Sequence, residues 1–137
     1  MIVVDGTVLA DHAFGDDMRR AACLKLQEID PEWITLALAR FEIGNVAWKM
    51  ARFGGVATDD AIAALRAANR LVGEFVDSIE SAEVLELGCE TGLTFYDASY
   101  VWLARSRGLE LRTRDKEILK QCPDVARPMP GGDATPD

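Results

Sequence analysis

Apolar residues along the chain form two patterns, short unbroken runs and longer stretches with helical spacing. The runs IVVD at 2–5, WITLA at 33–37 and LELRT at 109–113 are rich in β-branched residues or alternate in polarity, which is typical of strands. Shorter runs at 78–80 and 125–127 suit two further strands. Helical stretches separate these runs. This alternation predicts an α/β fold with three layers (α/β/α) and a mainly parallel central sheet.

The helical stretches end at glycine, proline or capping residues. A helix over 40–52 is followed by Gly54 and Gly55, and a long helix then begins at Thr58, with apolar side chains on one stripe as far as Val76. The middle of the chain is therefore predicted to be a helical hairpin over 40–76. Other helices are expected from about 7 to 14 and over 16–29, 82–90, 97–107 and 115–121.

Length and composition indicate one soluble domain. A chain of 137 residues that is 49% hydrophobic fits a single core, which we expect to occupy residues 1–127. The tail over 128–137 is rich in Pro and Gly and is expected to be disordered. No apolar run reaches the roughly 20 residues of a membrane span, and Met1 leads directly into a strand. We therefore expect a cytoplasmic protein with no membrane partner.

Cysteine, histidine and net charge exclude some kinds of site. Three separated cysteines and one histidine do not form a zinc-binding pattern. The net charge of −8 argues against binding nucleic acid through bulk charge. It leaves room for a local basic patch beside an acidic site, because bound cations change the local sign.

Four acidic residues fall near one edge of the predicted sheet. Asp5 ends the first strand, Glu42 follows the second, and Asp115 comes two residues after LELRT. Asp97 opens the helix that leads into LELRT. Right-handed crossovers bring the carboxyl ends of parallel strands to one edge, so we expect the four side chains to converge there.

Each acid also has an ordinary structural interpretation. Asp97 and Asp115 suit helix N-caps, and Asp5 followed by Gly6 suits the end of a strand. Glu42 is harder to explain in this way, because it lies among apolar and small residues where an isolated charge is costly. Four carboxylates without a histidine or cysteine partner favour Mg²⁺ or Mn²⁺. One or two such ions could activate water for cleavage of a phosphodiester.

The order of the motifs IVVD, FE, YDASYVWLA and LRTRD resembles the PIN-domain ribonucleases, and most closely the VapC-type toxins of toxin–antitoxin pairs. The resemblance covers residues 1–127. By motif it assigns catalytic and metal-binding roles to all four acids, and it matches Thr7 and Thr113 to hydroxyl residues that support the site. It implies Mg²⁺- or Mn²⁺-dependent endonucleolytic cleavage of RNA, a homodimer and a small antitoxin as partner.

Gly6 departs from the family pattern, which more often has Thr, Ala or Ser directly after the first acid. The glycine leaves the acid itself intact. Because glycine is conformationally permissive, we interpret it as a tolerated variant that loosens the backbone holding Asp5.

Three other interpretations concern parts of this pattern. Haloacid-dehalogenase-like phosphatases carry DxDGT, but Val3 stands where their nucleophile would be. A receiver domain would need other spacings than those of Glu42 and Asp97. The alternative that stays open is a PIN-like binding module whose catalytic site has degenerated.

Basic and aromatic residues suggest surfaces for partners. We expect Arg40, Arg112, Arg114 and Lys116 to contact RNA phosphates beside the acids, although basic side chains also occur on any solvated surface. The aromatic stripe of the hairpin suits a core. Part of it, Trp48, Met50 and Phe53, could instead line a groove for an amphipathic helix of the antitoxin.

Overall fold

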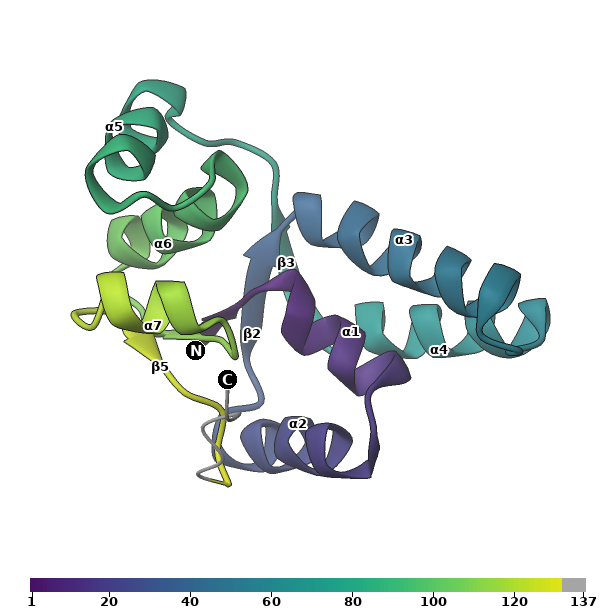
Figure 1. Ribbon diagram of the computed structural model, residues 1–137. Coiled ribbons are helices and arrows are strands. Elements are labelled where there is room, and N and C mark those ends of the chain that lie inside the picture. The colour runs from purple at the N-terminus through teal and green to yellow at the C-terminus, as the bar shows by residue number, and fades with distance from the viewer. Residues whose placement is uncertain (132–137) are drawn as a thin grey trace.

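The computed structural model describes residues 1–131, and a parallel β-sheet lies at its centre (Figure 1). Within these residues the sheet has five strands in the order β3-β2-β1-β4-β5, and each neighbouring pair is parallel. The central strand is buried along its whole length, as its unbroken β-branched run predicts. The strands are β1 (Ile2–Val4), β2 (Trp33–Leu36), β3 (Val72–Val76), β4 (Leu111–Arg112) and β5 (Ala126–Arg127).

Helices cover both faces of this sheet. In Figure 1 the first four helices lie on one side of the sheet and the last three on the other. The helices of residues 1–131 are α1 (Gly6–Phe14), α2 (Asp17–Ile29), α3 (Leu38–Phe53), α4 (Thr58–Arg70), α5 (Ser81–Thr91), α6 (Phe95–Arg107) and α7 (Lys116–Gln121). The predicted three-layer α/β/α fold with a parallel sheet is therefore confirmed.

The core lies where α1 and α6 pack against the central strands. Val3 and Val4 of β1 are fully buried, as are Leu9 of α1 and Val101 of α6. Trp33 at the start of β2 is also buried, and its indole N–H donates to the carbonyl of residue 30 at 2.8 Å. This packing fixes the carboxyl end of β1, from which the chain passes directly into α1.

The prediction for residues 71–80 was wrong. Helix α4 ends at Arg70, and Val72–Val76 form the edge strand β3 instead of prolonging the helix. The apolar positions 72, 75 and 76 fit helical spacing, but β-branched and aromatic residues around Gly73 also suit a strand, and pairing with β2 decides between them. Residues 78–80 form no strand, and Glu80 caps α5 instead. The predicted hairpin exists, but it consists of α3 and α4 alone.

The C-terminal segment continues along the body of the protein beyond β5. The carbonyl of Pro128 accepts a hydrogen bond of 2.9 Å from Nη1 of Arg112, and Met129 packs against the core. The rest of the tail that was expected to be disordered, residues 132–137, lies outside the described residues. Within residues 1–131, no helix has both the length and the apolar character to cross a membrane.

Candidate active site

Asp5 lies at the point where β1 passes into α1, and its side chain caps that helix. Its Oδ1 accepts hydrogen bonds from the Thr7 amide at 3.1 Å, the Thr7 hydroxyl at 2.6 Å and the Val8 amide at 3.2 Å. The residue is only 4% exposed. Asp5 is therefore both the end of the strand, as the sequence suggested, and the N-cap of α1. The cap also fixes the direction of the carboxylate, so capping and a role in the site are compatible.

Thr113 connects the first acid with the fourth. Its hydroxyl donates to Oδ2 of Asp5 at 2.5 Å and accepts from the backbone amide of Asp115 at 3.0 Å. Asp115 in turn caps α7, because its Oδ1 accepts from the Ile118 amide at 3.0 Å. Thr113 is completely buried. A single hydroxyl therefore links the ends of two neighbouring parallel strands, β1 and β4.

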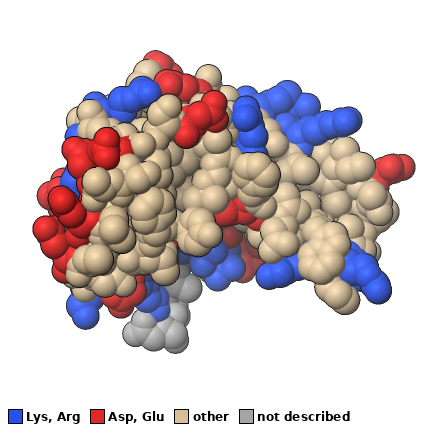
Figure 2. Space-filling model, turned by 90° about the horizontal axis from the view of Figure 1, so that it is seen from above, with Lys and Arg blue, Asp and Glu red and all other residues tan. Residues whose placement is uncertain are grey.

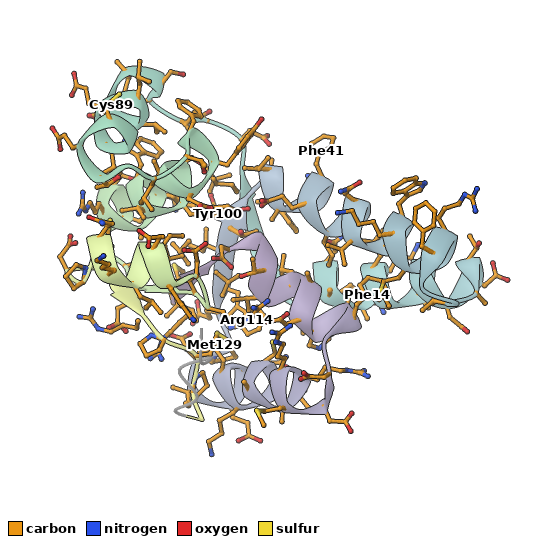
Figure 3. All side chains as sticks on the ribbon, in the orientation of Figure 1. Phe14, Phe41, Cys89, Tyr100, Arg114 and Met129 are labelled. Atoms are coloured by element: carbon orange, nitrogen blue, oxygen red, sulfur yellow. The ribbon has the colours of Figure 1, made fainter. Side chains whose placement is uncertain are left out.

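Glu42 lies in the second turn of α3 and reaches back over the start of α1. Its Oε1 accepts a short hydrogen bond from the hydroxyl of Tyr100, a buried residue of α6. Figure 3 shows Tyr100 on the side of α6 that faces the sheet. Gly6 lies directly beneath Glu42: a Cβ atom built on Gly6 would be 2.5 Å from Oε1 of Glu42. The glutamate thus occupies space that another residue at position 6 would fill.

Asp97 lies in the first turn of α6, but it does not cap that helix as the sequence suggested. The N-cap is Thr94, whose hydroxyl accepts from the Asp97 amide at 3.2 Å. The side chain of Asp97 is therefore available to face the other acids. Because Tyr100 follows it by three residues, the two side chains lie on the same face of α6.

The acids influence one another's ionisation. Burial raises the pKa of Asp5 above its ordinary value, and the charge of Asp115 adds to this effect. Burial also raises the pKa of Glu42, with further contributions from Asp5 and Asp97. The pKa of Asp97 is raised first by burial and then by the charges of Asp115 and Asp5. Asp5, Asp97 and Asp115 thus each raise the pKa of at least one other acid, and Glu42 is affected by two of them, as expected for carboxylates gathered at one edge of the sheet.

The donor set suits a hard divalent cation, although it is not a closed cage. Within residues 1–131, no three His, Cys, Asp or Glu side chains are arranged as a ready set of ligands. Mg²⁺ does not require such a cage, because it keeps several of its waters and often uses only one or two carboxylates. Acids that are buried and repel one another also gain from a neighbouring cation, which favours their charged forms. The residues present therefore fit Mg²⁺ or Mn²⁺.

The four basic residues proposed for RNA contact differ in their surroundings. Arg114 pairs with Asp11, from Nε to Oδ2 at 2.7 Å and from Nη2 to Oδ1 at 3.1 Å, and it lies close to α1 in Figure 3. Arg112 binds the carbonyl of Pro128. Arg40 is exposed, with its guanidinium 3.9 Å from the centre of the Phe75 ring. Lys116 opens α7 next to Asp115.

Charge is unevenly distributed over the face shown in Figure 2. Lys and Arg side chains lie on both halves of this face, while much of the acidic surface lies on the left-hand half. A polyanion that approached this face would therefore meet less negative charge on its right-hand half, the half of the molecule to which α3 belongs.

The contact between Tyr100 and Glu42 was not predicted from the sequence, and the interpretation of Gly6 left out its contact with Glu42. A signal for Tyr100 was present, since a tyrosine three residues after a proposed site acid shares its helix face. Gly6 was interpreted as a variant that loosens the site, whereas the structure shows it closely covered by Glu42. The Asp11–Arg114 pair was also missed, because nothing in the sequence brings positions 11 and 114 together.

The family to which this fold and site belong is shown by comparison with known proteins. The family model of the PIN domain matches residues 2–122. A curated relative named Ribonuclease VapC3, from Pyrobaculum aerophilum, is 31% identical over 93% of this chain and 98% of its own length. The chain therefore belongs to the PIN-domain family. Its curated relatives place it among the VapC-type members of that family.

Other relatives agree with this assignment. Exonuclease VapC9 of Pyrobaculum aerophilum is 44% identical over 86 residues, which are 61% of this chain and 62% of that protein. The crystal structure of PAE2754 from the same organism superposes with a TM-score of 0.73 at 33% identity, over 93% of this chain and 89% of that one. VapC20 of Mycobacterium tuberculosis, described as a toxin that cleaves the sarcin-ricin loop, has a TM-score of 0.55 at 20% identity over 80% and 85% of the two chains. This last likeness concerns the fold alone.

Proposed function

We propose that the protein is a divalent-metal-dependent endoribonuclease and the toxin of a toxin–antitoxin pair. The observation that carries this proposal is the gathering of acids from separate segments of the chain: the Thr113 hydroxyl joins Asp5 to the backbone of Asp115, and Glu42 lies against Gly6, next to Asp5. The charges of Asp5 and Asp115 also raise the pKa of Asp97. The relatives named ribonuclease and exonuclease support a nuclease. We place the nuclease domain in residues 1–127 and its action in the cytoplasm.

The four acids would hold Mg²⁺ or Mn²⁺, and the surrounding groups keep them in place. Bound there, the ion would supply Lewis-acid activation of an attacking water and charge balance for the phosphodiester. The hydroxyls of Thr7 and Thr113 orient Asp5 from both sides. This preorganisation means that the carboxylates need not rearrange when RNA arrives.

The substrate is proposed to be RNA, held beside the acids by its phosphates. Arg40 is exposed on α3, and Lys116 adjoins Asp115. Arg114 is held by its ion pair with Asp11, so phosphate contact would require it to give up part of that pairing. Replacing Arg40 with Ala should weaken RNA binding and flatten its salt dependence.

The decisive experiment measures RNA cleavage by protein purified without antitoxin, with EDTA and then with added Mn²⁺. We expect Asp97→Asn to abolish cleavage and growth inhibition, whereas Asp59→Asn, at an exposed position in the first turn of α4, should change neither. Full cleavage by Asp97→Asn would contradict the assigned site. RNA binding without metal-dependent cleavage by the unaltered protein would favour the alternative, a degenerate PIN-like binding module.

A circular RNA tests the endonucleolytic part of the proposal. One relative is named an exonuclease, and an exonuclease has no end to attack on a closed circle. We expect Mn²⁺-dependent conversion of circular RNA to linear products. An intact circle together with degraded linear RNA would show that the activity is exonucleolytic.

The antitoxin is proposed to bind the hairpin. A hollow of about 380 Å³ lies between α3 and α4 and is lined mainly by apolar and small side chains, among them Trp48, Ile62 and Leu65. Trp48 is 55% exposed, as an anchor for an amphipathic helix should be. The proposed groove thus includes Trp48, while Met50 and Phe53 do not line it. A homodimer is also proposed, and its mass in solution would test it.

A further inference from the structure

Two residues outside the acidic set determine where Glu42 lies. Gly6 has no side chain, and a Cβ atom at that position would lie 2.5 Å from Oε1, 3.0 Å from Cδ and 3.1 Å from Cβ of Glu42. Gly6 is not among the glycines with positive φ, so its backbone would accept alanine without strain. The glycine is therefore needed for the close approach of Glu42 and not for the turn itself.

Tyr100 holds the same carboxylate from the opposite helix layer. The tyrosine is 1% exposed, and its hydroxyl donates to Oε1 of Glu42. A buried hydroxyl must be hydrogen-bonded, so the tyrosine is as dependent on this arrangement as the glutamate. Helices α1, α3 and α6 thus meet at one carboxylate oxygen.

We propose that Gly6 and Tyr100 are positioning residues that hold the Glu42 carboxylate beside Asp5 and Asp97. The glycine provides the space and the tyrosine provides the hydrogen bond. This inference rests on the proposed metal-dependent function and extends it to two residues that touch the acid and not the substrate. It also means that position 6 has to be glycine in this chain if Glu42 is to keep its place.

The first test removes the hydroxyl and keeps the ring. We expect Tyr100→Phe to bind Mn²⁺ about 10- to 100-fold more weakly than the unaltered protein, in the range found when partners of metal ligands are replaced. Mn²⁺ binding is measured directly by calorimetry or electron paramagnetic resonance, without RNA. Tyr96→Phe is the matched control, because that tyrosine is 61% exposed on the same helix and its binding of Mn²⁺ should not change. Equal affinity in the two variants would overturn the proposal.

The second test asks whether Gly6 acts through Glu42. We expect Gly6→Ala to weaken Mn²⁺ binding about 10-fold and to lower the urea midpoint of unfolding, because the new methyl group displaces the carboxylate. In a Glu42→Ala background the same change should have almost no further effect, since the atoms it would meet are mostly gone. Gly44→Ala, where an added Cβ meets nothing within 4 Å, is the control. Additive effects of Gly6→Ala and Glu42→Ala would refute the coupling.

The unfolding measurements separate this inference from the proposed function. If the unaltered protein neither binds Mn²⁺ nor cleaves RNA, the proposed function fails. Urea unfolding without metal still shows whether the effects of Gly6→Ala and Glu42→Ala on stability are non-additive. That result decides whether Gly6 provides the space that the Glu42 side chain occupies. If the unaltered protein binds Mn²⁺ and cleaves RNA while Tyr100→Phe binds Mn²⁺ equally well, only the positioning role fails.

Discussion

The acidic edge of the sheet and the α3–α4 hairpin reverse the usual placement of polar and apolar side chains. At the edge, Asp5 is 4% exposed and Thr113 is fully buried. On the hairpin, Phe41 is 76% exposed, Trp48 55% and Phe53 71%. Buried carboxylates and exposed aromatic rings are both costly unless they serve binding. On the proposed function, the first region would bind metal and RNA and the second would bind the antitoxin.

The two regions also differ in how their side chains are held. Asp5 receives four hydrogen bonds, from two hydroxyls and two backbone amides. On the hairpin, Trp48 and Phe53 meet edge to face with centroids 5.6 Å apart, and the Arg52 guanidinium lies 5.2 Å from the centre of the Phe53 ring. The proposed catalytic carboxylate is therefore held by several hydrogen bonds, whereas the aromatic side chains of the proposed partner surface contact one another and a neighbouring arginine.

Among replacements that leave all four acids in place, the largest loss of metal binding is expected at Thr113. Thr113→Val removes the bonds to Asp5 and to the Asp115 amide, so we expect a loss of about 10- to 100-fold in Mn²⁺ affinity and RNA cleavage. The free energy of unfolding should fall by about 1–3 kcal/mol, because an amide and a carboxylate lose a partner. Calorimetry, a cleavage assay and urea unfolding would measure these changes.

Thr91→Val is the matched control for this prediction. The Thr91 hydroxyl also donates and accepts, to the carbonyl of Leu87 at 2.7 Å and from the amide of Leu93 at 3.2 Å, at the end of α5, which contains none of the four acids. Its replacement should lower stability while leaving Mn²⁺ affinity unchanged. The distinction between the two regions would be lost if both valine variants weakened metal binding to the same extent.

A smaller effect, confined to partner binding, is expected on the hairpin. Trp48→Ala should reduce affinity for the antitoxin by about 30-fold, as for a hot-spot residue worth about 2 kcal/mol, while RNA cleavage stays the same. Titration of the variant with the proposed antitoxin would measure this loss of affinity. Met18→Ala, at a residue 66% exposed on α2, is the control. A variant that loses cleavage as well would show that the hairpin belongs to the active site.

The smallest effect concerns pH. Because the pKa values of Asp5, Glu42 and Asp97 are raised in the folded protein, their contribution to stability is complete below the ordinary carboxyl pKa of about 4 and is lost as pH rises through the raised values. Without metal, the free energy of unfolding should therefore fall with rising pH over this window. Urea unfolding in EDTA should show a shallower fall for Asp5→Asn, which removes one of these groups.

Other acids also affect how the free energy of unfolding changes with pH. Asp124, whose pKa is lowered first by its hydrogen bonds to Arg105, contributes in the opposite direction, so the comparison is between variant and unaltered protein and not between absolute slopes. Added Mn²⁺ should reduce the difference, because a cation favours the charged carboxylates. Identical slopes for the two proteins in EDTA would contradict the raised pKa of Asp5.

Much of this arrangement could be predicted from the sequence, because it depends on where strands end. Asp5 follows an unbroken β-branched run, and Asp115 follows an alternating one, so parallel topology alone brings them to one edge. Their capping roles do not compete with that prediction, since a helix that begins at a strand end places its N-cap at the same edge.

Other features depend on contacts between distant segments, and local patterns do not show them. The segment over 72–76 has apolar spacing that fits helix and strand equally, and only pairing with β2 selects the strand. Gly6 was judged as a backbone residue, whereas its role depends on a side chain 36 positions later. The pairing of Tyr100 with Glu42 likewise joins residues 58 positions apart.

The hydrogen bond between Thr113 and Asp5 spans 108 positions of the chain and has a consequence for protein synthesis. The carboxylate at the start of the chain gains its last partner only after β4 has left the ribosome and docked beside β1. On the proposed function, we therefore expect a polypeptide that ends before β4 to leave the RNA of the cell intact. Toxicity would begin only with the finished fold, after a delay set by translation itself.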